Sequence, residues 1–167
     1  MKTTAAIAYA AVAFASSALA GCAQARHVDV MTILAYGNCQ TNEIGVRTID
    51  YATLATFRGA HLIGMTESDE SAQQPVHLIA IVPGEFPTAG YGVSLQEGAA
   101  LTADLLTIKV KTDRPSPDAM LAQMITHPCL VVGVADPAVA RVKVLDDSAA
   151  TLGEVDLRAS KEPLKAP

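Results

Sequence analysis

Two strand-like segments constrain the fold of this chain more than any other feature. Residues 77–82 are almost entirely apolar and end at Pro83, whereas residues 105–112 alternate Leu, Ile and Val with Thr and Lys. A period of two residues places alternate side chains on opposite faces of a strand. A continuous apolar run suits a strand that is buried on both faces. The two patterns together predict a mainly β protein.

Weaker strand patterns occur on both sides of these segments. The further predicted strands are residues 28–34, 46–51, 91–96, 130–134 and 139–145. Residues 120–125 fit a strand or a helix equally well. A series of strands joined by short loops, with very little helix, predicts an antiparallel β-sandwich or an open barrel.

One short helix is predicted over residues 51–58. Tyr51, Leu54 and Phe57 recur at a spacing of three, which places them on one helical face. Asp50 precedes them and is a suitable N-cap, because its side chain can accept a hydrogen bond from the first turn.

The N-terminus carries Lys2, then an apolar stretch, then Leu19-Ala20-Gly21-Cys22. This order of a cation, an apolar core and small residues is typical of a secretory signal. The tetrapeptide resembles the motif of bacterial lipoprotein signals. The resemblance implies that residues 1–21 are removed and that Cys22 carries membrane lipid, with fatty acyl chains such as palmitate. Residues 22–27 would then be a lipidated tether.

Two alternatives to lipidation remain at this stage. One alternative is that the apolar stretch stays as a membrane span, but a span needs roughly 20 strongly apolar residues, and this stretch is shorter, mostly alanine, and interrupted by Ser16 and Ser17. Ordinary signal cleavage after Ala20 or Ala25 also satisfies the small-residue rule.

Lipidation predicts a protein anchored in the cell envelope. Ala23 favours the periplasmic face of the outer membrane if the cell has two membranes.

Charge and composition limit the partners. Half of the chain is apolar and 17% is charged, and loss of residues 1–21 removes one lysine and no acid, which takes the net charge from -5 to -6. Nucleic-acid binding requires a stripe of Lys and Arg, so we expect no nucleic acid.

Residues 28–147 predict one domain with one core. Residues 148–167 contain few large apolar side chains and predict a flexible tail, held loosely at most by Val155 and Leu157.

Cys39 and Cys129 remain once Cys22 is assigned to lipid. An even pair of cysteines outside the cytoplasm favours a disulfide. In the chain-entropy model a bridge over such a long loop contributes about 4.5 kcal/mol. The alternative is two unpaired cysteines that act as small buried hydrophobes. Redox catalysis is disfavoured because the chain has no Cys-x-x-Cys.

Motifs of catalysis are absent from the sequence. There is no Gly-x-Ser-x-Gly, no His-Glu-x-x-His, no phosphate-binding glycine loop and no dinucleotide fingerprint. The histidines lack ligand spacing, and the acidic loop lacks the pattern of a calcium loop. These residues are His27, His61, His77 and His127, and Glu67, Asp69 and Glu70. We expect no enzymatic activity, no catalytic residue, no cofactor and no metal.

Residues 84–93 read Gly-Glu-Phe-Pro-Thr-Ala-Gly-Tyr-Gly-Val, and downstream come residues 106–111, Arg-Pro-Ser-Pro at 114–117 and Thr-His-Pro at 126–128. This series resembles the C-terminal domain of PrcB-type protease-complex subunits over residues 76–145. Two positions depart from the pattern of that family, which commonly has an aromatic residue at Cys129 and glycine at Ala89. The resemblance implies an extracytoplasmic lipoprotein that binds or stabilises a partner, namely a protease.

The segment from Pro87 to Tyr91 is the predicted partner-binding loop. Pro87 fixes φ, Gly90 can adopt a positive φ, and Thr88 can hydrogen-bond the turn backbone. Tyr91 can pack inward or present its ring to a partner. The segment is therefore either a contact loop or only a well-formed turn with Tyr91 in the core.

Two other functions remain open. The Pro-Thr-x-Gly-Tyr sequence from Pro87 to Tyr91 is similar to one loop of chagasin-type cysteine-protease inhibitors, although the other two loop motifs of those inhibitors are absent. The third possibility is a structural envelope lipoprotein with no dedicated partner.

Overall fold

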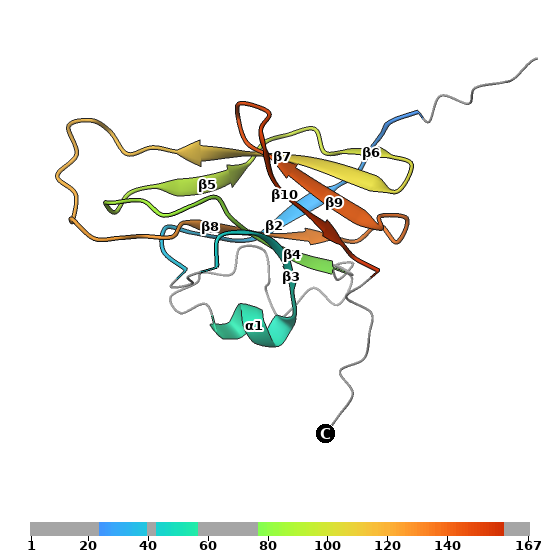
Figure 1. The fold of residues 1–167 in the computed structure, drawn as a ribbon, viewed down its shortest axis with the longest axis horizontal. Coiled ribbons are helices and arrows are strands. Elements are labelled where there is room, and N and C mark those ends of the chain that lie inside the picture. Colours follow the sequence, from blue (N-terminus) through green and yellow to red (C-terminus); the bar gives the residue numbers. More distant parts are fainter. Residues whose placement is uncertain (1–23, 40–42, 57–76, 159–167) are drawn as a thin grey trace, which may run out of the picture.

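The computed structural model describes residues 24–39, 43–56 and 77–158, and it contains two β-sheets with a short helix below one of them (Figure 1). The elements in chain order are β1 (Arg26–His27), β2 (Val30–Tyr36), β3 (Gly45–Ile49), α1 (Tyr51–Thr56), β4 (His77–Val82), β5 (Gly92–Leu95), β6 (Ala100–Thr102), β7 (Leu105–Asp113), β8 (Cys129–Val134), β9 (Arg141–Leu145) and β10 (Thr151–Asp156).

The first sheet has the strand order β1-β6-β7-β9-β10, and β5 pairs with β7 beyond the end of β6. The second sheet has the order β2-β8-β4-β3. Among the described strands every pairing is antiparallel except that of β7 with β9. The predicted β-sandwich is thus confirmed, and the two sheets do not join into a closed barrel.

The main core lies between the two sheets. β7 buries Leu106, Ile108 and Val110, as its alternation predicts, while the intervening side chains are half-buried or exposed. These side chains meet Ile79 and Ile81 of β4 from the second sheet. Burial of such side chains provides the main stabilising free energy of a domain.

A second apolar cluster covers the outer face of the second sheet and includes Leu54 of α1. This cluster explains the continuous apolar runs in β4 and β8, because both strands are buried on two faces. The helix begins where predicted, since the Thr53 N–H donates to Asp50 Oδ1 over 2.7 Å. Phe57 lies outside the described residues.

The prediction that residues 148–167 form a flexible tail was wrong for residues 148–158. Residues 151–156 form β10, which pairs with β9 and lies against β3. Leu157 is only 1% exposed, and its N–H donates to the Ala140 carbonyl over 2.8 Å. Backbone pairing and one buried leucine order the segment although few of its side chains are large and apolar.

Three other features differ from the sequence predictions. Residues 26–27, assigned to a tether, form β1 and pair with β6, so the ordered domain extends beyond 28–147 at both ends. The short strand β6 was not predicted. Residues 120–125 form neither strand nor helix. In the part of the chain that the structure describes, no helix is long and apolar enough to span a membrane.

Candidate functional site

Two loops meet at the left end of the sandwich in Figure 1: a hairpin, residues 84–91, and a long loop, residues 114–128. Phe86 and Thr126 form an isolated antiparallel bridge, in which each N–H donates to the other carbonyl over 2.9 Å. The Ala89 N–H donates to the Ala122 carbonyl over 3.1 Å. The hairpin is therefore bonded along its length to the long loop.

Gly90 lies close to two side chains of the long loop. It has a φ of +92°, and a β-carbon at this position would lie 3.0 Å from Pro115 Cβ and 3.1 Å from Leu121 Cδ2. An L side chain would thus suffer backbone strain and steric overlap together. The sequence argument for a positive φ at Gly90 is confirmed, and the structure adds a packing reason.

Thr126 joins the same two loops through its side chain. Its hydroxyl donates to the Thr88 carbonyl over 2.9 Å, and the residue is only 2% exposed. The bond uses the carbonyl of Thr88, whereas the sequence argument assigned the turn contact to the Thr88 hydroxyl. A buried hydroxyl without a partner is costly, so this bond favours the closed arrangement of the loops.

Tyr91 and Pro87 differ in how they are presented to solvent. The Tyr91 ring stacks on Phe86, with centroids 4.3 Å apart and planes inclined by 24°, and it is half-buried. Pro87 is exposed. Of the predicted contact residues, Thr88 and Gly90 contact the long loop, whereas Tyr91 stacks on Phe86 within the hairpin.

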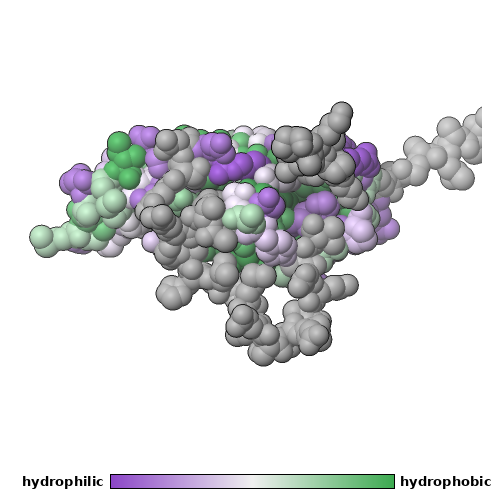
Figure 2. All heavy atoms as spheres, turned by 90° about the horizontal axis from the view of Figure 1, so that it is seen from below, coloured by the Kyte–Doolittle hydropathy of each residue, from purple (hydrophilic) through white to green (hydrophobic). Residues whose placement is uncertain are grey.

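The exposed apolar side chains at this end belong to the long loop. Met120 is fully exposed, while Met124 and Ile125 are 48% and 60% exposed. Figure 2 shows apolar side chains gathered at the same end of the molecule. Sequence reasoning did not identify these residues as surface residues. The sequence signal that could have identified them is the pair Pro115 and Pro117, because two prolines end the preceding strand and begin an irregular surface segment.

The disulfide between Cys39 and Cys129 borders the long loop. The two Cα atoms are 5.9 Å apart, and both residues are buried. The Cys39 N–H donates to the His127 carbonyl over 2.9 Å. The predicted pairing is confirmed, and it ties the end of β2 to the start of β8 beside the candidate site.

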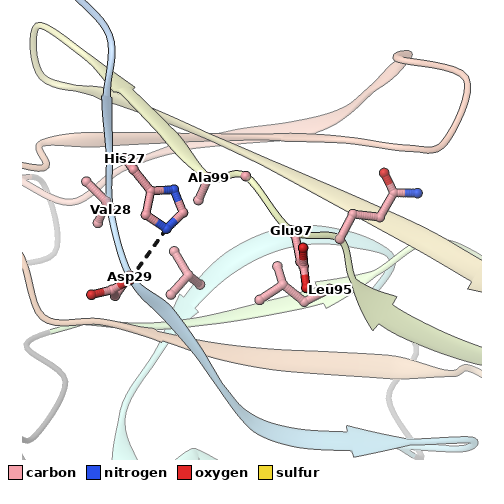
Figure 3. Close-up of a pocket in the computed structure, with 9 residues that line it drawn as sticks. His27, Val28, Asp29, Leu95, Glu97 and Ala99 are labelled. Carbon is pink, nitrogen blue, oxygen red and sulfur yellow. Dashed lines mark ion pairs between the residues drawn. The ribbon is translucent and has the colours of Figure 1, made fainter.

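A surface recess lies near β1, away from the two loops, and is shown in Figure 3. It has a volume of about 510 Å³, and Val28, Leu95 and Ala99 are among the residues that line it. His27 Nε2 is 3.5 Å from Asp29 Oδ1, and both side chains are well exposed to water. Within residues 24–39, 43–56 and 77–158, no group of three or more His, Cys, Asp or Glu side chains could hold a metal. The recess contains no nucleophile beside a base.

Asp104 is the centre of a charge cluster on the first sheet that includes Arg141 and Arg158. Its Oδ1 accepts from Arg141 Nη2 over 3.0 Å, and its Oδ2 accepts from Arg158 Nη2 over 2.8 Å. The Arg141 hydrogen bond and charge, with that of Arg158, lower the pKa of Asp104. The cluster links the β6–β7 turn to β9 and to the end of β10, so we assign it a structural role.

Several predicted residues cannot be placed. Cys22, His61 and the acidic residues Glu67, Asp69 and Glu70 lie outside the described part of the chain.

The described residues form a β-sandwich with two hydrogen-bonded loops at one end. Residues 77–135 match the family model described as PrcB C-terminal, in agreement with the resemblance that the sequence motifs show. The match runs from β4 to the end of β8 and contains both loops of the site. It ends before residue 145, the limit inferred from the resemblance. No curated protein and no solved structure matches the chain significantly.

Proposed function

We propose that this protein is a lipid-anchored, extracytoplasmic binding module that acts as an accessory or stabilising subunit of an envelope or secreted protease complex. The observation that carries the proposal is the match of residues 77–135 to the PrcB C-terminal family. The matched residues include the hairpin and the long loop, so the region of family likeness coincides with the end of the sandwich suited to a partner.

The N-terminal sequence and the disulfide support the location. Leu19-Ala20-Gly21-Cys22 has the form of a lipoprotein signal, and acylation of Cys22 would hold the domain at a membrane without any spanning helix. The buried bridge between Cys39 and Cys129 suits an oxidising compartment. We assign the protein to the cell envelope on these grounds.

The proposal includes no catalytic activity and no cofactor for this chain. The candidate site offers hydrogen-bonded backbone, prolines and apolar side chains, which are groups that recognise a protein. A chagasin-type inhibitor would need the tip of the hairpin to enter a cleft of the protease. Gly90 instead lies against Pro115 and Leu121, so the geometry favours the accessory subunit.

The test is purification of the tagged, full-length protein from its native envelope in mild detergent. Mass spectrometry would then examine the N-terminal peptide and any protein recovered with it. A stoichiometric protease together with an acylated Cys22 is the expected result. Recovery of acylated protein without a protease would contradict the accessory role but leave the anchor in place. A free N-terminus at another residue would contradict the anchor.

A further inference from the structure

We infer that the partner is contacted by the long loop, through Met120, Met124 and Ile125, and that the hairpin is the platform that holds this loop. The surface formed by these three side chains is called the apolar tip. The partner that fits it is a protein with an uncharged, apolar groove. This inference rests on the proposed function and identifies the surface that would carry it out.

Several backbone groups of the hairpin are already engaged by the long loop. The Thr88 carbonyl accepts from Thr126, and the Ala89 N–H donates to Ala122. Gly90 has no space for a side chain between Pro115 and Leu121. Two of the residues that the sequence suggested for a partner, Thr88 and Gly90, therefore contact the long loop, whereas Pro87 is exposed.

The long loop, in contrast to the hairpin, presents large apolar side chains to solvent. Its residue Leu121 is partly buried against Gly90, while Met120, Met124 and Ile125 face solvent. No charged residue occurs between Asp118 and His127. Exposed large apolar side chains that follow one another along a loop without intervening charges are suited to a binding surface. Methionine suits such a surface because its flexible side chain adapts to the shape of a partner.

The bonds to the hairpin also prepare the loop for binding. Residues 122 and 126 are fixed by backbone hydrogen bonds on either side of Met124 and Ile125. A loop whose backbone is already ordered loses less conformational entropy when a partner binds. This gives a physical reason for a long loop held by a separate hairpin.

Two observations favour a protein over a lipid bilayer as the occupant. The described chain begins at residue 24, and in Figure 1 that end lies at the opposite extreme of the long axis from the long loop. An anchor at Cys22 would thus attach the far end of the domain to the membrane. In addition, Asp118 is the only charged residue between Pro115 and His127, whereas segments that bind anionic membranes carry Lys or Arg.

The test compares the wild-type chain with a variant whose tip is polar, Met120→Ser, Met124→Ser and Ile125→Ser combined. The matched control is Met31→Ser with Ile44→Ser, two exposed apolar residues outside both loops. Wild type and control are expected to bring down a protease, and the tip variant at least about tenfold less of it, because apolar anchors dominate protein interfaces. The thermal unfolding midpoint would establish that all three proteins are folded.

A second measurement leaves the fold intact and identifies the occupant. Met120, and separately Ile44, is replaced by the photo-crosslinking residue p-benzoylphenylalanine in the full-length protein in native membranes. We expect an adduct to the protease from position 120 and none from position 44. Adducts from position 120 to lipid or to a second copy of this chain would overturn the inference.

The outcomes separate the two proposals. If the wild-type protein recovers a protease and the tip variant recovers as much, the inference fails while the accessory role stands. If the wild-type protein recovers no protease, the proposed function fails and the inference fails with it.

Discussion

Gly153 of β10 lies directly against Val46 of β3, where a β-carbon on the glycine would be 2.9 Å from Val46 Cγ2 and 3.0 Å from Val46 Cβ. The contact joins an edge strand of one sheet to an edge strand of the other. It coincides with a register shift in β10 between Thr151 and Gly153. The last strand can approach the second sheet this closely because it has no side chain at that point.

The first prediction concerns this contact. Gly153→Ala should lower the free energy of unfolding by about 1–3 kcal/mol, the usual cost of overpacking. Val46→Ala should relieve part of the loss in the double variant, because it removes Cγ2 but leaves Cβ in place; a double-mutant cycle in urea would measure this coupling. Gly84→Ala is the control, because a β-carbon there meets nothing within 4 Å. Additive effects of the two substitutions would contradict the proposed contact.

The second prediction concerns the hairpin. Gly90→Ala combines an unfavourable φ of +92° with overlap against Pro115 and Leu121. We expect a loss of about 1–3 kcal/mol and faster hydrogen exchange at the Ala89 and Thr126 amides, which bond across the two loops. Unchanged exchange at these amides would show that the hairpin does not hold the long loop.

The third prediction concerns the disulfide. Cys39 and Cys129 are separated by 90 residues, and removal of such a bridge typically costs about 2–5 kcal/mol. Cys39→Ala with Cys129→Ala should therefore lower the denaturant midpoint. Dithiothreitol should destabilise the wild-type protein similarly and should leave the double variant unaffected. An equal effect of the reductant on both proteins would contradict a contribution from this bridge.

The fourth prediction concerns pH. The pKa of Asp104 is lowered in the folded protein by Arg141 and Arg158, so its contribution to stability is fully present above its ordinary pKa of about 3.9. This contribution is lost as the pH falls through the lowered folded value. Asp104→Asn should reduce the unfolding temperature at pH 7, and the difference from wild type should shrink as the pH falls below about 3.9.

The control for this pH series is Asp118→Asn, which removes an exposed carboxylate from the long loop. It should leave the unfolding temperature at pH 7 close to that of wild type. A difference for Asp104→Asn that stayed constant from pH 7 to pH 2 would show that the charge of Asp104 is not the cause.

The main strands could be predicted from the sequence because their side-chain patterns are set by burial. The alternation in β7 and the apolar run in β4 correspond directly to one and two buried faces. The cysteine pair was also predictable from composition and compartment. In these cases the side chains themselves carry the structural information.

The remaining elements depend on partners distant in the sequence. β10 has few large apolar residues and is ordered by its pairing with β9, which no local pattern reveals. The sequence predicts a contact loop at the hairpin because the turn residues of the hairpin are distinctive. The need for glycine at position 90 comes partly from Pro115 and Leu121, which are distant in the sequence. The large exposed apolar side chains at this end belong to the long loop.

Among the described strands β2 pairs only with β8, and Cys39 at the end of β2 is bridged to Cys129 at the start of β8. A chain exported N-terminus first would therefore deliver β2 to the envelope long before its partner strand. The native bridge cannot form until Cys129 has left the export channel, and the pairing of β2 is complete only after residue 134 has followed. During that interval an unpaired apolar strand is exposed to aggregation and proteolysis. For an exported chain, chaperones and the machinery that oxidises cysteines should thus determine how much of the protein matures.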